Sequence, residues 1–77
     1  MSRFKVGDAV VLQVDLPDEG LKKGQLGAVV LEFDQPTIAY ETEFCDSEGR
    51  TVAQLALRPD QIVHYNDWPR PGAGTKS

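Results

Sequence analysis

The sequence predicts an all-β protein, folded as one small barrel of five strands. Short runs of β-branched and aliphatic residues alternate with polar residues, as they do in half-buried strands. Turn residues separate these runs, and no segment of useful length has the period of a helix. The 77 residues correspond to one domain. At this size a chain buries only about 60% of the surface that it exposes when unfolded, so the predicted core is small.

The first two strands are expected on either side of a long loop. In VGDAVVLQVD the side chains of Val10, Leu12 and Val14 recur with period two. Pro17 ends this strand because proline has no N–H to donate. The run GAVVLEF predicts a second strand over residues 28–33. This second strand is apolar on both faces, so its alternation does not by itself show which face is buried.

The third strand, in TIAYETEFC, has the clearest alternation. The side chains expected to face the core are those of Ile38, Tyr40, Thr42 and Phe44. The opposite face turns Glu41 and Glu43 to water. The residues DSEG then predict a hairpin turn in which Gly49 takes a positive φ. TVAQLAL is expected to form the fourth strand.

A short 3-10 turn over RPDQ and a brief strand in IVHY complete the pattern. Pro59 presets φ for the first position of that turn. Five strands, one long loop after the first strand and a 3-10 turn before the last fit an SH3-like barrel. We assign residues 1–66 to this barrel. Residues 67–77 contain two Pro, two Gly and little apolar surface beyond Trp68, so they predict a flexible C-terminal tail.

The predicted core gathers the apolar side chains that this alternation turns inward. It consists of Val10, Leu12, Val14, Val29, Leu31, Ile38, Tyr40, Phe44, Leu55 and Ile62. Aromatic and branched side chains in such positions supply most of the stabilisation that a small barrel gains from burial.

The stretch DLPDEGLKKGQLGAVV is expected to be a long turn and not a phosphate-binding loop. A phosphate loop needs glycines that lead into the N-terminus of a helix. Here the glycines lead into AVVLEF, which is predicted to be a strand. Gly24 and Gly27 are expected to take a positive φ or to allow a close approach of the backbone. Lys22 and Lys23 are expected to point to solvent at the loop tip.

Composition argues against several classes of function. The net charge is −4, with twelve acidic residues against eight basic ones that are scattered along the chain. Nucleic-acid binding needs clustered Lys and Arg, so no nucleic-acid partner is expected. No apolar run approaches the roughly 20 residues of a membrane span, so no membrane partner is expected either. One cysteine and no visible secretory segment predict a reduced, cytoplasmic protein.

The sequence predicts neither a catalytic site nor a cofactor or metal site. Cys45 and His64 are the only candidates for a nucleophile and its base. Cys45 is interpreted as a small apolar residue beside a turn, and His64 as an edge residue of the last strand. The residues DSEG resemble part of a calcium loop but lack its other ligands. The protein is therefore not expected to be an enzyme.

The predicted function is that of a small cytosolic protein–protein binding module. The residues predicted to contact a larger, basic protein partner are Asp15, Glu41, Glu43, Asp46, Tyr65 and Trp68. Acidic surfaces speed encounter with basic partners, and exposed Tyr and Trp are common at interfaces. Two alternatives stay open. The acidic stripe also fits a solvated strand face that resists aggregation, and Trp68 also fits a cap on one end of the barrel.

Three segments resemble a family of short bacterial proteins known only as a domain of unknown function. They are FKVGDAVVL, DLPDEGLKKGQLGAVV and YETEFCDSEGRTVAQLALRPDQI, which together cover residues 4–62. The resemblance implies an SH3-like fold. It also implies an antitoxin or immunity protein that neutralises a partner toxin as an alternative function. Thr42 departs from the family pattern, in which an aliphatic residue is usual at this position.

A weaker resemblance is confined to FKVGDAVVL and the Gly-x-x-Gly that follows it. This part is similar to the SH3-like domain of the nitrile hydratase β subunit, which implies an accessory subunit of an enzyme complex. A similar glycine-rich hairpin occurs in KOW modules, which implies a nucleic-acid-binding barrel. The acidic balance of the chain disfavours the KOW alternative.

Overall fold

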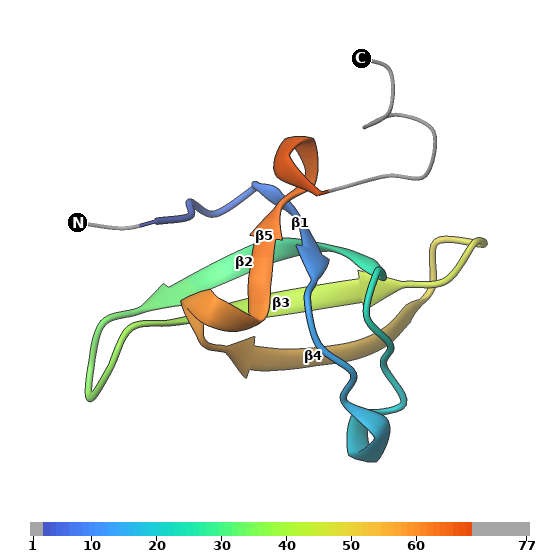
Figure 1. The fold of residues 1–77 in the computed structure, drawn as a ribbon, viewed down its shortest axis with the longest axis horizontal. Helices are drawn as coiled ribbons and strands as arrows, with labels where there is room; N and C mark the ends of the chain where they lie inside the picture. Colours follow the sequence, from blue (N-terminus) through green and yellow to red (C-terminus); the bar gives the residue numbers. More distant parts are fainter. Residues whose placement is uncertain (1–2, 69–77) are drawn as a thin grey trace.

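The computed structural model describes residues 3–68, which form a single antiparallel sheet with strand order β4-β3-β2-β1-β5. The strands are β1 (Ala9–Leu12), β2 (Leu26–Phe33), β3 (Ala39–Cys45), β4 (Thr51–Leu57) and β5 (Ile62–His64). Three 3-10 turns accompany them: η1 (Pro17–Glu19), η2 (Pro59–Gln61) and η3 (Tyr65–Asp67). Figure 1 shows the sheet curling so that β5 crosses over β2 and β3. The predicted all-β class, the five strands and the 3-10 turn before the last strand are confirmed.

The predicted tail overlaps the described residues only at its start. Asp67 is the last residue of η3, and Trp68 follows it. Residues 69–77, together with the flexibility expected of them, lie outside the described residues.

Strand β1 holds the barrel together because it pairs with β2 on one side and β5 on the other. Val10 lies opposite Gly27 in β2 and His64 in β5. On the far side of β2, the sheet continues through β3 to β4, where Tyr40 lies opposite Leu57. This register turns the alternate side chains of all five strands toward one interior.

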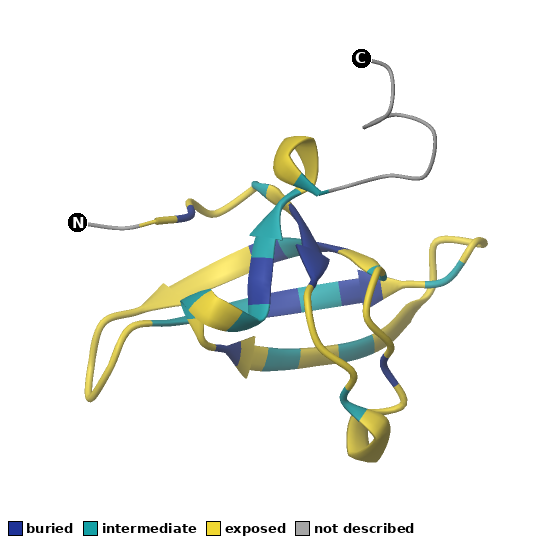
Figure 2. Cartoon of the chain, viewed as in Figure 1, coloured by how far each residue is buried: buried dark blue, intermediate teal, exposed yellow. Residues whose placement is uncertain are grey.

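The core is a compact cluster inside the curled sheet, visible as the buried residues of Figure 2. Its buried apolar members are Phe4, Val10, Leu12, Leu21, Val29, Tyr40, Phe44, Leu57 and Ile62. Thr42 is buried among them, and its hydroxyl donates a 3.0 Å hydrogen bond to the carbonyl oxygen of Tyr40. Thr42 therefore faces inward as predicted. Its side-chain hydroxyl can be buried because it has a hydrogen-bond partner in its own strand.

Six of the ten predicted core residues are buried, a seventh is half-buried and three are exposed. Leu55 is half-buried against the cluster. The prediction was wrong for Val14, Leu31 and Ile38, all of which are exposed. β1 ends at Leu12, so its alternation does not extend to Val14. Ile38 precedes β3 at the end of the β2–β3 hairpin, which Figure 1 shows reaching beyond the barrel.

Leu31 is exposed because β2 contains a bulge. Val29 pairs with Thr42 but Leu31 pairs with Glu41, so Val30 is an extra residue between them. One extra residue reverses the alternation beyond it. Leu31 consequently lies on the same face as Glu41, outside the barrel.

Four buried residues were missed, and two of them come from segments predicted to be irregular. Phe4 packs edge-on against Tyr40, with ring centroids 5.0 Å apart. Leu21, in the long loop, is only 1% exposed and belongs to the core. Val11 and Leu57 are the other two.

The long loop between β1 and β2 uses its glycines in two different ways. Gly24 has a φ of 97°, the left-handed region that favours glycine. Gly27 has an ordinary strand conformation, but a Cβ there would lie 2.8 Å from the ring of Phe44. Gly24 thus provides the expected positive φ, and Gly27 allows the expected close approach. Lys22 and Lys23 are exposed, as expected, although their backbone N–H groups bond to the side chains of Gln25 and Asp15.

Candidate interaction surface

The three long strands β2, β3 and β4 turn a second face away from the core. We call this the outer face. Its members follow from the register of the strands, and they include Ala28, Leu31, Phe33, Ala39, Glu41, Glu43, Gln54 and Ala56. Because strand side chains alternate between the two sides of a sheet, these residues form one continuous surface. The predicted outward orientation of Glu41 and Glu43 is thus realised in the structure.

The outer face is acidic and lacks basic residues. Glu41 and Glu43 lie on this face, and the sequences of β2, β3 and β4 contain no Lys or Arg. Among residues 3–68, neither Glu41 nor Glu43 has a cationic group within ion-pair distance. Their carboxylates accept hydrogen bonds from neutral side chains of β4. Gln54 Nε2 donates to Glu41 over 3.2 Å, and the Thr51 hydroxyl donates to Glu43.

Apolar side chains lie directly beside these carboxylates. Leu31 is opposite Glu41 in the β2–β3 register and is 50% exposed. Phe33, two residues further along β2, is 36% exposed. On the other side of Glu41, in β4, stands the small side chain of Ala56. The surface therefore combines negative charge with exposed apolar area, the mixture found in protein interfaces.

Asp46 directly follows β3, and its carboxylate stabilises the hairpin turn. Its carboxylate accepts the backbone N–H groups of Glu48 and Arg50 and the Nε–H of Arg50. The backbone hydrogen bond from Arg50 is the main reason that the pKa of Asp46 lies below its ordinary value of 3.8. Asp46 is next to the outer face, and its charge is already paired within the turn.

Asp15 is not part of the same cluster. It lies in the loop after β1, where its Oδ1 accepts the backbone N–H of Lys23 over 2.9 Å. It lines a hollow with Pro17, Gly20 and Leu21 that is separate from the outer face. The structure therefore brings Glu41, Glu43 and Asp46 together and leaves Asp15 apart.

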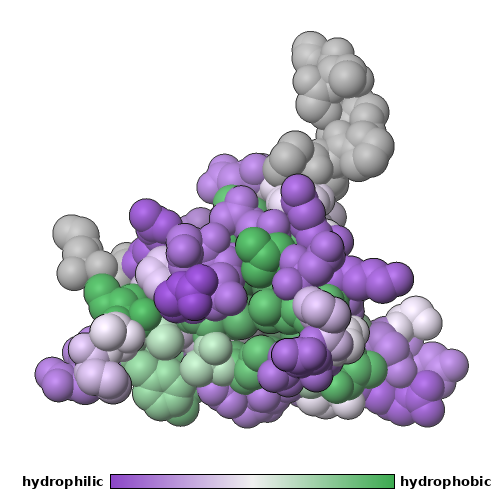
Figure 3. Space-filling view, turned by 60° about the horizontal axis from the view of Figure 1, so that its bottom comes forward, coloured by the Kyte–Doolittle hydropathy of each residue, from purple (hydrophilic) through white to green (hydrophobic). Residues whose placement is uncertain are grey.

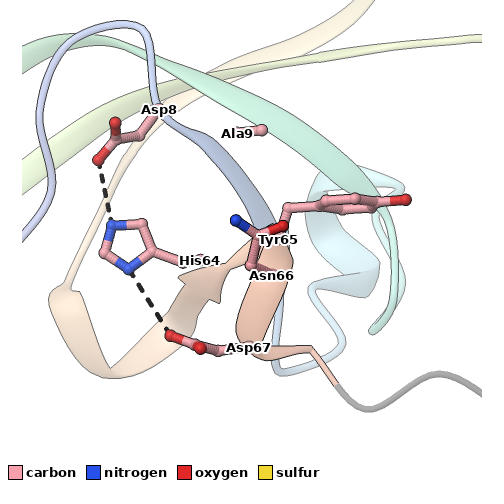
Figure 4. Close-up of a pocket in the computed structure, with 6 residues that line it drawn as sticks. All are labelled: Asp8, Ala9, His64, Tyr65, Asn66 and Asp67. Carbon is pink, nitrogen blue, oxygen red and sulfur yellow. Dashed lines mark hydrogen bonds and ion pairs between the residues drawn. The ribbon is translucent and has the colours of Figure 1, made fainter. Parts of the chain in front are cut away.

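The two aromatic residues lie elsewhere, at η3. Tyr65 is partly exposed and lines a shallow pocket beside β1 (Figure 4). Trp68 is half-buried, and its ring lies 3.8 Å from the position that a Cβ on Gly24 would occupy. Trp68 thus folds back toward the β1–β2 loop. The predicted acidic and aromatic residues form two separate groups.

The pocket beside η3 contains an arrangement that the sequence did not reveal. His64 Nε2 lies 3.1 Å from Asp8 Oδ2, and His64 Nδ1 lies 4.0 Å from Asp67 Oδ2 (Figure 4). The centroid of the Phe4 ring lies 4.5 Å from that of the imidazole ring. The imidazole is therefore held between two carboxylates and one aromatic ring.

Asp8 is the better fixed of the two carboxylates. The backbone N–H of Lys5 donates to Asp8 Oδ2 over 2.9 Å, and this hydrogen bond is the main reason that the pKa of Asp8 is lowered. Burial opposes this effect and raises the pKa, while the hydrogen bond and charge of His64 lower it by smaller amounts. The charge of Asp8 thus ties the segment before β1 to β5.

The chemistry of this pocket is limited by its lining. An imidazole oriented by a carboxylate can act as the base of a nucleophilic site when a hydroxyl or thiol lies within hydrogen-bond reach. The described residues that line the pocket are Asp8, Ala9, His64, Tyr65, Asn66 and Asp67, and none of them is Ser, Thr or Cys. Cys45 is exposed at the end of β3, contrary to its interpretation as a packed residue. It lines a different hollow, which shares only Ala9 with this pocket.

Sequence reasoning missed the Asp8–His64 contact because the two residues are 56 positions apart. No local pattern marks such a pair, and only the β1–β5 pairing brings them together. The described residues contain no group of three or more His, Cys, Asp or Glu placed to hold a metal ion. In the same part of the chain, no helix is long and apolar enough to cross a membrane.

Comparison with known protein families places the chain in a family. Residues 7–64 match the family DUF4926, whose description is a domain of unknown function. The chain belongs to the DUF4926 family. The match spans β1 to β5 and therefore includes the whole outer face of this DUF4926 domain. No curated protein and no solved structure matches the chain.

Proposed function

We propose that this DUF4926 domain is a protein-binding module that recruits a basic partner through its outer face and has no catalytic activity of its own. The observation that carries the proposal is the composition of that face. Glu41 and Glu43 stand beside exposed Leu31 and Phe33 on three strands without a single Lys or Arg. Such a surface fits a partner that presents Arg or Lys next to apolar side chains.

The hydrogen bonds to β4 support this proposal. Gln54 and Thr51 hold the carboxylates of Glu41 and Glu43 in place without neutralising them. Two arginines at the barrel ends are ion-paired within their own turns. Arg50 is paired with Asp46 and Glu48, and Arg58 with Asp60. Fixed charges cost less conformational entropy on binding than mobile ones.

The acidic balance of the chain and the scatter of its basic residues argue against a KOW-like, nucleic-acid-binding function. Phosphate binding relies on clustered cations that release counterions together.

A toxin with a basic surface is one kind of partner that the outer face would fit, and an antitoxin role would be a special case of this proposal. The free, exposed thiol of Cys45 suits a reducing compartment, in keeping with a cytoplasmic role.

The proposal is tested by affinity capture from a lysate of the source organism, with two charge-reversed variants compared. Glu41→Lys/Glu43→Lys reverses the outer face. Asp18→Lys/Glu19→Lys, in the exposed turn η1, makes the same change elsewhere. Each pair replaces two acids with two bases, which changes the formal net charge from −4 to 0. We expect a salt-sensitive partner that the η1 variant retains and the outer-face variant loses. Equal capture by all three proteins would contradict the proposal.

A further inference from the structure

Within residues 3–68, the sheet has one long edge strand, β4, whose outer backbone groups are free to pair with another strand. β4 is the terminal strand of the sheet, and among the described residues it pairs only with β3. No backbone hydrogen bond outside that pairing involves residues 51–57 in the described part of the chain. The other edge strand, β5, has only three residues before η3 begins.

Exposed edges usually carry charges, Pro or a strong irregularity that prevents another strand from pairing. The seven residues of β4, TVAQLAL, include no charged residue, no Pro and no Gly. A register shift lies at the Thr51 end, between the pairs Phe44–Ala53 and Cys45–Thr51. From Ala53 to Leu57 the pairing with β3 is regular. This part of the strand therefore offers a regularly spaced, uncharged row of backbone groups.

The two faces next to this edge differ in chemistry. On the inner side, Ala53 and Leu55 are only half-buried and pack at the margin of the core. Figure 3 shows apolar side chains between polar ones on the side of the molecule that was at the bottom of Figure 1, where β4 runs. On the outer side, Ala56 and Gln54 lie between the edge and the carboxylates of Glu41 and Glu43.

We propose that the β4 edge binds an extended segment of the basic partner as an added strand. The added segment has apolar side chains toward Leu55 and arginine or lysine side chains toward Glu41 and Glu43. This inference rests on the proposed function and specifies how the partner is held. Backbone pairing would supply affinity, and the alternating side chains would supply specificity.

The distances of sheet geometry allow the charged contacts. An added strand would lie two strand spacings, about 10 Å, from β3. An extended arginine side chain reaches about 7 Å from its Cα at ordinary bond lengths, and the glutamate side chain covers the remainder. Ala56, directly opposite Glu41, is too small to block this path. An arginine opposite Ala56 would therefore lie over the Ala56 methyl group and meet Glu41.

Charge favours a basic segment over a second copy of this chain. Two copies would each bring a net charge of −4 and the unpaired Glu41 and Glu43 close to the shared edge. Like charges oppose such an approach, whereas a cationic strand neutralises the same carboxylates.

The test is an NMR titration of the ¹⁵N-labelled full chain with capped peptides of alternating valine and arginine, as long as β4. Two further peptides carry backbone N-methyl groups, one at all valines and the other at all arginines. N-methylation removes the N–H donors of one edge and leaves charge and composition unchanged. We expect the largest shifts at the amides of residues 51–57. One methylated peptide should bind at least about tenfold more weakly, because it loses several hydrogen bonds, while the other should retain its affinity.

Three results would overturn strand addition: no saturable binding, shifts confined to residues outside β4, or equal affinity of all three peptides. In the last case, loss of binding in Glu41→Lys/Glu43→Lys would leave the proposed function standing with a different docking mode. Light scattering after gel filtration measures whether a second copy of the chain occupies the edge instead. A stable dimer that the peptide does not dissociate would show that a second copy takes the edge, and would also overturn the inference.

Discussion

At the scale of single residues, close contacts decide what this small core tolerates. Phe44 is fully buried at the centre of the core cluster and lies against the backbone of Gly27. Thr42 is accommodated next to it because its hydroxyl bonds to Tyr40. A chain of this size has little surplus stability, so each of these contacts has a measurable effect.

Gly27→Ala should destabilise the domain through its contact with Phe44. The new Cβ would lie 2.8 Å from the aromatic ring and 2.9 Å from the backbone oxygen of Glu43. Overpacking of this kind costs about 1–3 kcal/mol, measured as the free energy of unfolding in urea. In a Phe44→Leu background the same Gly27→Ala substitution should cost less, because the ring atoms in conflict are absent. A Gly27→Ala variant as stable as the wild type would show that the strand shifts freely.

Asp8 should make the domain more stable near neutral pH than in acid. Its pKa is lowered below 3.8, mainly by the backbone N–H of Lys5 and also by His64. The ionised carboxylate therefore stabilises the fold above that ordinary value, and this contribution is lost as the pH falls through the lower folded pKa. Asp8→Asn should reduce the difference in unfolding free energy between about pH 5.5 and about pH 2.5. An unchanged difference would mean that the Asp8 contacts do not stabilise the fold.

At the scale of elements, the strands could be predicted and their ends could not. The alternation in TIAYETEFC identified the buried face of β3, including Tyr40 and Phe44. The bulge at Val30 left no mark in the sequence, because every residue around it is apolar. Leu31 was for that reason assigned to the core instead of the outer face. Likewise, the open edge of β4 depends on strand order, which a single strand does not encode.

The β1–β2 loop combines a local pattern with a contact that the pattern did not predict. Its glycines and lysines fit a long turn, but Leu21 enters the core, and Leu16 and Leu21 bond to each other across the loop. Contacts between a loop and a distant core depend on the whole fold. The same limit applies to the Asp8–His64 pair.

Leu21→Ala should destabilise the domain as a core substitution does, although Leu21 lies in a loop. Truncating a buried leucine costs about 2–5 kcal/mol, whereas the same change at exposed Leu26 should have a much smaller effect. Urea melts of the two variants make the comparison. Equal losses would show that the loop does not close the barrel interior.

At the scale of the whole molecule, the distribution of charge matters more than its total. All charged residues in strands β2 to β4 are acidic, and Arg50 and Arg58 at the barrel ends are paired with their own neighbours. The outer face is therefore acidic and partly apolar, and its three strands contain no Lys or Arg to balance the charge. This asymmetry is the basis for proposing a basic protein partner.

The same charge distribution predicts no stable binding to nucleic acid. At an ionic strength of about 0.15 M, mixed-sequence DNA and RNA should show no shift in a gel when the protein is added. Tight, salt-sensitive binding would instead support the KOW-like alternative. Lys22, Lys23 and Arg50 would then be the first residues to replace.

The most direct test of the proposed binding surface measures how fast the captured partner associates with the domain. Charges beyond about 8 Å are screened at physiological ionic strength, so lowering the salt should raise the association rate for the wild type and for Asp18→Lys/Glu19→Lys. Glu41→Lys/Glu43→Lys should associate more slowly and with little salt dependence. Its melting temperature should stay near that of the wild type, because the carboxylates of the half-buried Glu41 and Glu43 make only exposed hydrogen bonds and, within residues 3–68, no ion pair. An association rate of the outer-face variant equal to that of the wild type at both salt concentrations would contradict the assignment of Glu41 and Glu43 to the binding surface.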